Sequence, residues 1–185
     1  IVTFEFENVP AASVEALVML GVEVAPGPQA LAVAQDRVDE KSFLNANGVA
    51  TVAFAAADSA ESCVKAAARI GAPCLMKTRR EGYDGKGQVW VEHAAGAAQA
   101  FEALGGRPVI LEAPADFVRE LSIIAARGRD GAIAVYPLAE NHHEKGVLRR
   151  SVAPAKVGVA TAAQAERIAH KILTGLAYVG VIGIE

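Results

Sequence analysis

The chain has few cysteines, little net charge and no long apolar run, and each absence excludes a class of protein. Its 2 cysteines, Cys63 and Cys74, lack metal-ligand spacing, so we expect both to be reduced core residues. The formal net charge is only -3, and Lys and Arg are spread along the chain, which argues against a nucleic-acid partner. No apolar stretch reaches the ~20 residues that span a bilayer, and the N-terminus lacks the layout of a signal peptide. We therefore expect a cytoplasmic protein without a membrane partner.

The composition that is present is typical of a globular protein, with 52% hydrophobic and 21% charged residues over 185 positions. The chain opens without Met on the alternating pattern Ile1–Glu7 and closes in the apolar run Val179–Glu185. Both patterns predict strands. Because strands at raw chain ends usually need neighbours, we expect the chain to be truncated at both ends.

Between these ends, periodic patterns of both helices and strands occur. Pro26–Pro28 is predicted to be a turn. Capping boxes are predicted at Asp58 with Glu61 and at Thr161 with Gln164. Helices are predicted over Val14–Leu20, Asp39–Asn45, Asp58–Arg69, Ala94–Leu104 and Thr161–Leu173. Strands are predicted over Cys74–Thr78, Val89–Val91 and Val109–Glu112, with an antiparallel hairpin of Arg119–Ala126 and Ala132–Pro137. This mixture predicts an α+β fold.

The strongest functional signal is the glycine-rich loop Gly82–Gln88, which connects two predicted strands. Its glycines free the backbone to turn N–H groups toward an anion, so the loop is a candidate phosphate cradle. It lacks the Gly-Lys-Ser/Thr ending of a P-loop, and a strand rather than a helix follows, which disfavours a Walker-type NTPase. The alternative is a flexible hairpin tip.

Lys77 closes the strand just before this loop, where its ammonium can reach the same phosphates as a point charge. Arg79, Arg80 and Lys86 add positive charge nearby. A lysine at a strand end is often only an exposed charge on a buried stem, and this remains the alternative.

Three carboxylates end or begin predicted strands among apolar neighbours: Glu112, Glu120 and Glu185. Nucleotide-bound magnesium is held by one or two such groups, which makes Glu185 a candidate metal ligand; the alternative is an ordinary hydrogen-bonded acid. His142 and His143 are adjacent on an extended segment and so face opposite ways, which excludes chelation of one metal by both. They are predicted to lie in a surface loop or to contact phosphate or substrate.

Six segments, in order and spacing, resemble the 5-(carboxyamino)imidazole ribonucleotide synthases of the ATP-grasp superfamily. The resemblance covers essentially the whole chain. The segments are Gln35-Asp36-Arg37, Lys77-Thr78-Arg79-Arg80, Gly82–Gln88, Arg119-Glu120-Leu121-Ser122, Tyr136-Pro137-Leu138-Ala139-Glu140-Asn141 and Ala153-Pro154-Ala155.

The resemblance implies an ATP-grasp fold, in which ATP and magnesium lie between two α+β lobes. It implies that ATP phosphorylates bicarbonate to carboxyphosphate, which carboxylates aminoimidazole ribonucleotide and leaves ADP and phosphate. It also implies a homodimer for the full-length protein. The implied domains are the end of an N-terminal nucleotide-binding-like domain over 1–35, a small lobe over 36–116, and a truncated large lobe over 117–185.

For the nucleotide, the resemblance implies phosphate contacts from Arg37 and Lys77. It implies a mobile flap, a hinge that reads the adenine edge and a ribose acceptor, Glu120. It further implies that His143 contacts the nucleotide and that Glu185 is the first magnesium carboxylate. The flap residues are Gly82, Tyr83, Asp84, Gly85, Lys86, Gly87 and Gln88, and the hinge residues are Glu112, Ala113, Pro114 and Ala115.

For the second substrate, the resemblance implies that Tyr83, Asp84 and Lys86 face the ribonucleotide and bicarbonate. Lys86 holds a phosphate and Asp84 takes or orients the amine proton, so both count as catalytic. The resemblance also implies that Glu7 touches the imidazole of the substrate. Two alternatives remain: another ATP-grasp ligase, of the formate-dependent glycinamide ribonucleotide transformylase or biotin carboxylase type, and a non-catalytic ATP-binding module.

Overall fold

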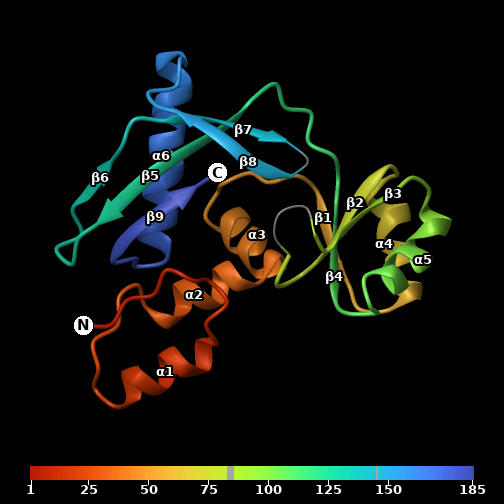
Figure 1. The fold of residues 1–185 in the computed structure, drawn as a ribbon, viewed down its shortest axis with the longest axis horizontal. Coiled ribbons are helices and arrows are strands. Elements are labelled where there is room, and N and C mark those ends of the chain that lie inside the picture. The colour runs from red at the N-terminus through yellow and green to blue at the C-terminus, as the bar shows by residue number, and fades with distance from the viewer. Residues whose placement is uncertain (83–85, 145) are drawn as a thin grey trace.

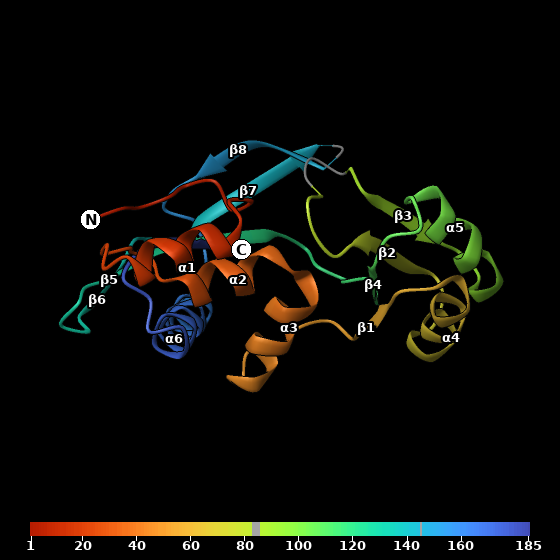
Figure 2. The same cartoon turned by 90° about the horizontal axis from the view of Figure 1, so that it is seen from below.

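Two antiparallel sheets, each with its own hydrophobic core, organise the chain in the computed structural model, which describes residues 1–82, 86–144 and 146–185 (Figure 1). The content is α+β, as predicted. Three N-terminal helices complete the described structure, and the third of them lies between the two sheets (Figures 1 and 2).

The first sheet has four strands in the order β1-β4-β2-β3. Helices cover one of its faces, and the core between them contains Met76, Leu111 and Phe101. Alternate residues of β2 are buried, as the period of a strand facing one core requires. The elements are β1 (Phe54–Ala57), α4 (Ala60–Ile70), β2 (Cys74–Thr78), β3 (Gln88–Val91), the 3₁₀ turn η1 (Ala94–Gly96), α5 (Ala97–Ala103) and β4 (Val109–Glu112).

The second sheet is built around β5, which pairs with three other strands. A single long helix, α6, packs on it through Ala169, Ile172 and Leu173. The strand order is β6-β5-β7-β8, with β9 also on β5. The elements are β5 (Glu120–Arg127), β6 (Ile133–Val135), β7 (Ala139–Glu144), β8 (Val147–Val152), α6 (Val159–Gly175) and β9 (Gly180–Ile184).

The N-terminal helices are α1 (Ala11–Met19), α2 (Pro28–Gln35) and α3 (Arg37–Ala46). Phe43 and Leu44 of α3 pack on the core of the second sheet, whereas Lys41 of the same helix contacts Glu112 of the first sheet. Helix α3 therefore connects the two cores. The predicted division at residues 35/36 and 116/117 stays a prediction.

Some predicted elements are wrong. Ile1–Glu7 is not a strand: among the described residues only Val2 forms a bridge, with Val24, so the alternating pattern has no ladder to join. Helix α4 is capped by Ser59 with Ser62 rather than by Asp58 with Glu61. Helix α6 begins earlier than the Thr161 box, at Val159, because Gly158 provides the extended N-cap backbone.

Other elements were missed. Pro28 is the first residue of α2 rather than part of a turn, a position that proline favours in helices. His142 and His143 lie in strand β7, not in a loop.

The strands β2 and β4 and the antiparallel pairing of β5 with β6 are confirmed.

Both cysteines are free and buried, as predicted. Over the described ranges, no helix is long and apolar enough to cross a membrane.

Candidate functional site

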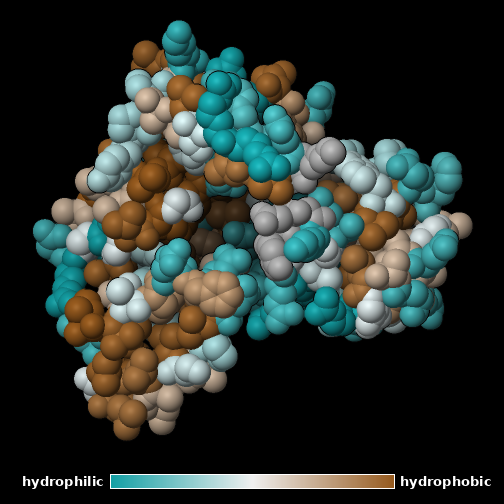
Figure 3. Space-filling view, in the orientation of Figure 1, coloured by the Kyte–Doolittle hydropathy of each residue, from teal (hydrophilic) through white to brown (hydrophobic). Residues whose placement is uncertain are grey.

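The molecular surface is hollowed between the part built by β5–β9 and the part built by β1–β4 (Figure 3). Each predicted site residue that the structure describes lies on a strand of one of the two sheets or in a segment next to such a strand, on α3, or in the N-terminal arm. Tyr83, Asp84 and Gly85 lie outside the described residues.

A buried carboxylate, Glu112 at the end of β4, lies between two lysines from different elements. Lys77 Nζ of β2 is 2.7 Å from Glu112 Oε2, and Lys41 Nζ of α3 is 3.2 Å from Glu112 Oε1. Burial raises the pKa of Glu112, but the hydrogen bonds and charges of the two lysines outweigh it and hold that pKa below its ordinary value. Glu112 is therefore ionised, and the three side chains together carry one net positive charge.

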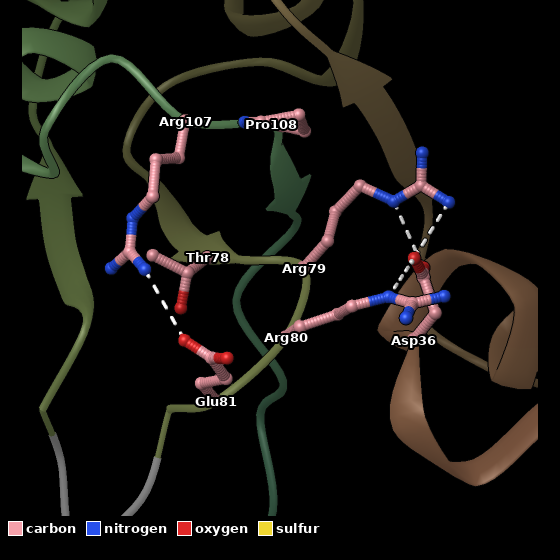
Figure 4. Close-up of a pocket in the computed structure, with 7 residues that line it drawn as sticks. All are labelled: Asp36, Thr78, Arg79, Arg80, Glu81, Arg107 and Pro108. Atoms are coloured by element: carbon pink, nitrogen blue, oxygen red, sulfur yellow. Dashed lines mark hydrogen bonds and ion pairs between the residues drawn. The ribbon is translucent and has the colours of Figure 1, made fainter. Parts of the chain in front are cut away.

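A second buried carboxylate, Asp36, joins α3 to the end of β2. Its side chain caps α3 by accepting hydrogen bonds from the N–H groups of Val38 and Asp39. The guanidinium groups of Arg79 and Arg80 converge on the same carboxylate (Figure 4). These contacts occupy one side of a cleft of about 340 Å³, whose other wall carries an exposed pair of Arg107 with Glu81.

The described residues at the neck of the glycine loop are held by specific contacts. Arg37 Nη2 donates to the Gly82 carbonyl at 2.8 Å, and the Thr78 N–H donates to the Gly87 carbonyl at 2.9 Å. Gly87 has φ +71°, and a Cβ there would lie 2.9 Å from Thr78 Oγ1. Glycine is therefore required at this position both by backbone conformation and by space.

The predicted hinge continues directly from β4. The Ala113 N–H donates to the Ala53 carbonyl at 2.9 Å, and Pro114 has no N–H. Ala115 is therefore the first residue after β4 whose N–H can serve a ligand. Pro114 and Ala115 are exposed.

On the second sheet, Glu120 and His143 are brought together. Glu120 begins β5, and its Oε2 lies 2.8 Å from His143 Nδ1 of β7. A β-bulge between His142 and His143 interrupts the register of β7 with β8. Both side chains are partly exposed, at 40% for Glu120 and 25% for His143, so they form a polar, accessible pair.

Glu185, which follows β9, is held by a buried asparagine. Asn141 Nδ2 donates to Glu185 Oε1 over a long 3.4 Å, while Asn141 Oδ1 accepts from Ser151 Oγ at 2.8 Å. Within the described ranges, no group of three or more His, Cys, Asp or Glu side chains is placed to hold a metal. A single carboxylate such as that of Glu185 suits a cation that takes most of its ligands from phosphate oxygens and water, as magnesium does.

Glu7 lies in the N-terminal arm with an exposed side chain. The arm is tied to the end of α2, where Gln35 Nε2 donates to the carbonyls of Glu7 and Val9. Nothing in these contacts tests the predicted substrate role of Glu7.

The sequence did not predict three residues that position other side chains of this site. They are Asp36, which binds Arg79, Lys41, which binds Glu112, and Asn141, which binds Glu185. An Asp directly before a helix is an N-cap signal, which points to Asp36. Lys41 follows Arg37 by four positions, so both lie on one face of α3, and that spacing was a usable signal. Nothing in the sequence distinguishes Asn141 as the buried partner of Glu185.

Three comparisons relate the chain to known proteins. The family model described as ATP-grasp domain matches residues 42–185. The N5-carboxyaminoimidazole ribonucleotide synthase of Brucella melitensis biotype 1 is 43% identical over 100% of this chain and 51% of that protein.

Two solved structures share the fold. That of N5-carboxyaminoimidazole ribonucleotide synthetase from Thermus thermophilus matches with TM-score 0.89 and 43% identity, over 98% of this chain and 49% of that one. N5-carboxyaminoimidazole synthase from Aspergillus clavatus, in complex with ADP and 5-aminoimidazole ribonucleotide, matches with TM-score 0.86 and 26% identity. The match covers 99% of this chain and 48% of that one. The chain thus spans about half the length of these relatives.

Proposed function

We propose that this chain, which belongs to the ATP-grasp family, binds ATP in the hollow between its two sheets as part of an enzyme that carboxylates 5-aminoimidazole ribonucleotide. One observation carries the proposal. Arg37 Nε is the one buried side-chain nitrogen or oxygen without a hydrogen-bond partner in the described part of the chain. A buried donor left unpaired costs about 1–3 kcal/mol. The unpaired Arg37 Nε beside the glycine loop therefore favours binding of an anionic ligand there.

Two cations from different elements are proposed to contact the phosphates. Arg37 approaches from α3, and Lys77 approaches from the end of β2, directly before the loop. Guanidinium and ammonium groups form charge-assisted hydrogen bonds with phosphate oxygens. The loop supplies backbone N–H groups over the same anion.

The base and sugar of ATP fit between the hinge and the pair Glu120–His143. Ala115 offers the first available hinge N–H, and we propose that a hinge carbonyl accepts from the adenine amine. Glu120, held by His143, is an acceptor for the ribose hydroxyls. A carboxylate in contact with a histidine is fixed in position and still has lone pairs left to accept from a ligand.

The proposed site also binds magnesium, for which Glu185 would contribute one carboxylate ligand beside the phosphate oxygens. The ion would supply charge neutralisation at the transferred phosphate. Asn141 fixes the Glu185 side chain for that role, since its own side chain is buried and held by Ser151.

The reaction proposed for the whole protein has two steps. A bicarbonate oxygen attacks the terminal phosphorus of ATP, which gives ADP and carboxyphosphate. The exocyclic amine of 5-aminoimidazole ribonucleotide then takes the carboxyl group, and phosphate and a proton leave. Lys86 and Asp84 of the loop, together with Glu7, are proposed to face the ribonucleotide. A homodimer and a cytoplasmic location also remain proposals.

The test is release of phosphate from ATP by the intact protein, measured with and without each second substrate. We expect release that requires both bicarbonate and 5-aminoimidazole ribonucleotide. Stimulation by biotin or by glycinamide ribonucleotide with formate would assign the chain to another ATP-grasp ligase. Saturable ATP binding without release under any of these conditions would identify a non-catalytic ATP-binding module.

A further inference from the structure

Lys41 has no role in the proposed function, yet it completes a cluster of charges at the boundary between the two sheets. Its Nζ lies 3.2 Å from Glu112 Oε1, while Lys77 Nζ lies 2.7 Å from the other oxygen. The Glu112 side chain is 7% exposed, against 19% for Lys41 and 25% for Lys77. The carboxylate is thus the most buried of the three groups.

This arrangement poses a problem for phosphate binding by Lys77. If the Lys77 ammonium turns toward a nucleotide phosphate, it gives up part of its contact with Glu112. A buried carboxylate that loses its only cation strongly destabilises the structure, because its charge is then uncompensated. One lysine has three N–H donors and can contact both groups, but its single positive charge balances only one of the two anions.

We propose that Lys41 is a positioning residue, the second counter-ion of Glu112, which keeps this carboxylate ionised and in place while Lys77 binds the nucleotide phosphates. This inference rests on the proposed function. Lys41 acts through Glu112 and does not touch the nucleotide.

The position of Lys41 supports this role. It lies on α3, a helix whose start is fixed to the end of β2 by Asp36 and Arg79, so its approach to Glu112 is independent of the loop. Its neighbour Glu40 adds negative charge close by. Burial raises the pKa of Glu40, the charges of Lys41 and Arg37 lower that pKa, and those of Glu7 and Glu112 raise it further, so these groups interact. Among the described residues, the charges that act on Glu112 come from Lys77 of β2 and from Lys41 and Glu40 of α3.

The experiment measures binding of magnesium ATP to the intact protein by titration calorimetry at pH 8 and pH 6. The variants are Lys41→Met, Glu112→Gln, the double variant and Lys41→Arg, which keeps the charge. Lys65→Met is the matched control, because Lys65 is 74% exposed and, within the described part of the chain, forms an ion pair with Glu61 alone. Each variant's affinity is divided by that of the wild type at the same pH, which cancels the effect of ATP protonation on binding.

At pH 8 we expect Lys41→Met to bind ATP about tenfold more weakly, in line with the loss of a charge-assisted contact. At pH 6 the deficit should shrink, because in the ATP-bound variant Lys77 has turned to the phosphate, and a buried carboxylate left without a cation takes up a proton more readily. Adding Glu112→Gln to Lys41→Met should restore most of the affinity and abolish the pH effect. Lys41→Arg should behave as the wild type.

Two outcomes overturn the inference. Wild-type affinity of Lys41→Met at both pH values shows that the second counter-ion is not needed. A deficit that is equal at both pH values and is not restored by Glu112→Gln shows that Lys41 contacts the nucleotide or only supports the fold.

Unfolding measurements decide the case in which Lys41→Met does not fold. The inference expects the double variant with Glu112→Gln to be more stable than Lys41→Met alone, and a less stable double variant contradicts it. This comparison needs no nucleotide. If the wild type itself shows no saturable ATP binding, the proposed function fails, and the unfolding comparison still tests whether Lys41 is the counter-ion of Glu112.

Discussion

Asp36 and Arg79 form a two-point ion pair that joins the start of α3 to the end of β2. Arg79 Nε lies 2.9 Å from Asp36 Oδ1, and Arg79 Nη2 lies 2.8 Å from Asp36 Oδ2. The same carboxylate caps α3, and the next residue, Arg37, reaches the loop neck at Gly82. One buried side chain therefore fixes the helix from which both Arg37 and Lys41 project.

Replacement of Asp36 should lower stability measurably. We expect Asp36→Asn to reduce the free energy of unfolding by about 2 kcal/mol, because asparagine preserves the cap but leaves Arg79 with only the exposed and more distant Asp39 as a charged partner. Asp39→Asn is the matched control. Asp39 is 54% exposed and lies 3.6 Å from the same guanidinium, so a change below about 0.5 kcal/mol is expected. Equal effects of the two variants in chemical denaturation would contradict this account.

The Asp36 pair also predicts a pH dependence. Burial raises the pKa of Asp36, but hydrogen bonds from Arg79, Val38 and Arg80 outweigh it and hold the pKa below the ordinary value of 3.8. A depressed carboxyl pKa stabilises the fold above the unfolded value and loses that effect as the pH falls through the folded one. The stability difference between the wild type and Asp36→Asn should therefore be constant above about pH 5 and shrink below about pH 4. If the stability difference between the two proteins grows on acidification, the pKa of Asp36 is not lowered by folding.

Gly87 is predicted to be irreplaceable at the loop neck. A side chain at its φ of +71° costs about 1–2 kcal/mol in backbone strain, and a Cβ would lie 2.9 Å from Thr78 Oγ1. We expect Gly87→Ala to weaken ATP binding about tenfold, equivalent to about 1.4 kcal/mol. Gly96→Ala should change neither stability nor binding, because Gly96 has φ -77° and open space around its Cα. ATP affinity of Gly87→Ala equal to that of the control would remove the neck from the binding site.

Glu120 is predicted to read the ribose. The wild type should bind ATP about 10 to 100 times more tightly than 2′,3′-dideoxy-ATP, the range for a hydrogen bond to a charged group. Glu120→Ala should bind the two nucleotides equally. Glu166→Ala, a change at an exposed glutamate of α6, should keep the preference. A preference retained by Glu120→Ala would place the ribose elsewhere.

The sequence was sufficient where local patterns decide the structure. Apolar runs within Cys74–Thr78 and Val109–Glu112 predicted β2 and β4, and the glycine loop between two strands was recognised from its composition. The family resemblance added the roles of Lys77 and Glu120 at positions where the structure now places accessible or paired charges.

Sequence patterns failed where a distant partner decides the outcome. Ile1–Glu7 alternates like a strand, but pairing depends on a neighbouring strand, which a local pattern does not reveal. The contact of Lys41 with Glu112 joins residues 71 positions apart, and that of Asn141 with Glu185 joins residues 44 apart. Such pairs follow from how α3 and the two sheets are packed, and no periodicity encodes them.

The central claim, that ATP binds between the sheets with its phosphates at Lys77, is tested most directly by one titration. Magnesium ATP is titrated into the intact protein as wild type, Lys77→Met and Lys65→Met. The account predicts affinity about 10 to 100 times weaker for Lys77→Met, as for the loss of a charge-assisted hydrogen bond, and no change for Lys65→Met, whose lysine is exposed on α4. Equal affinities for all three proteins would contradict it.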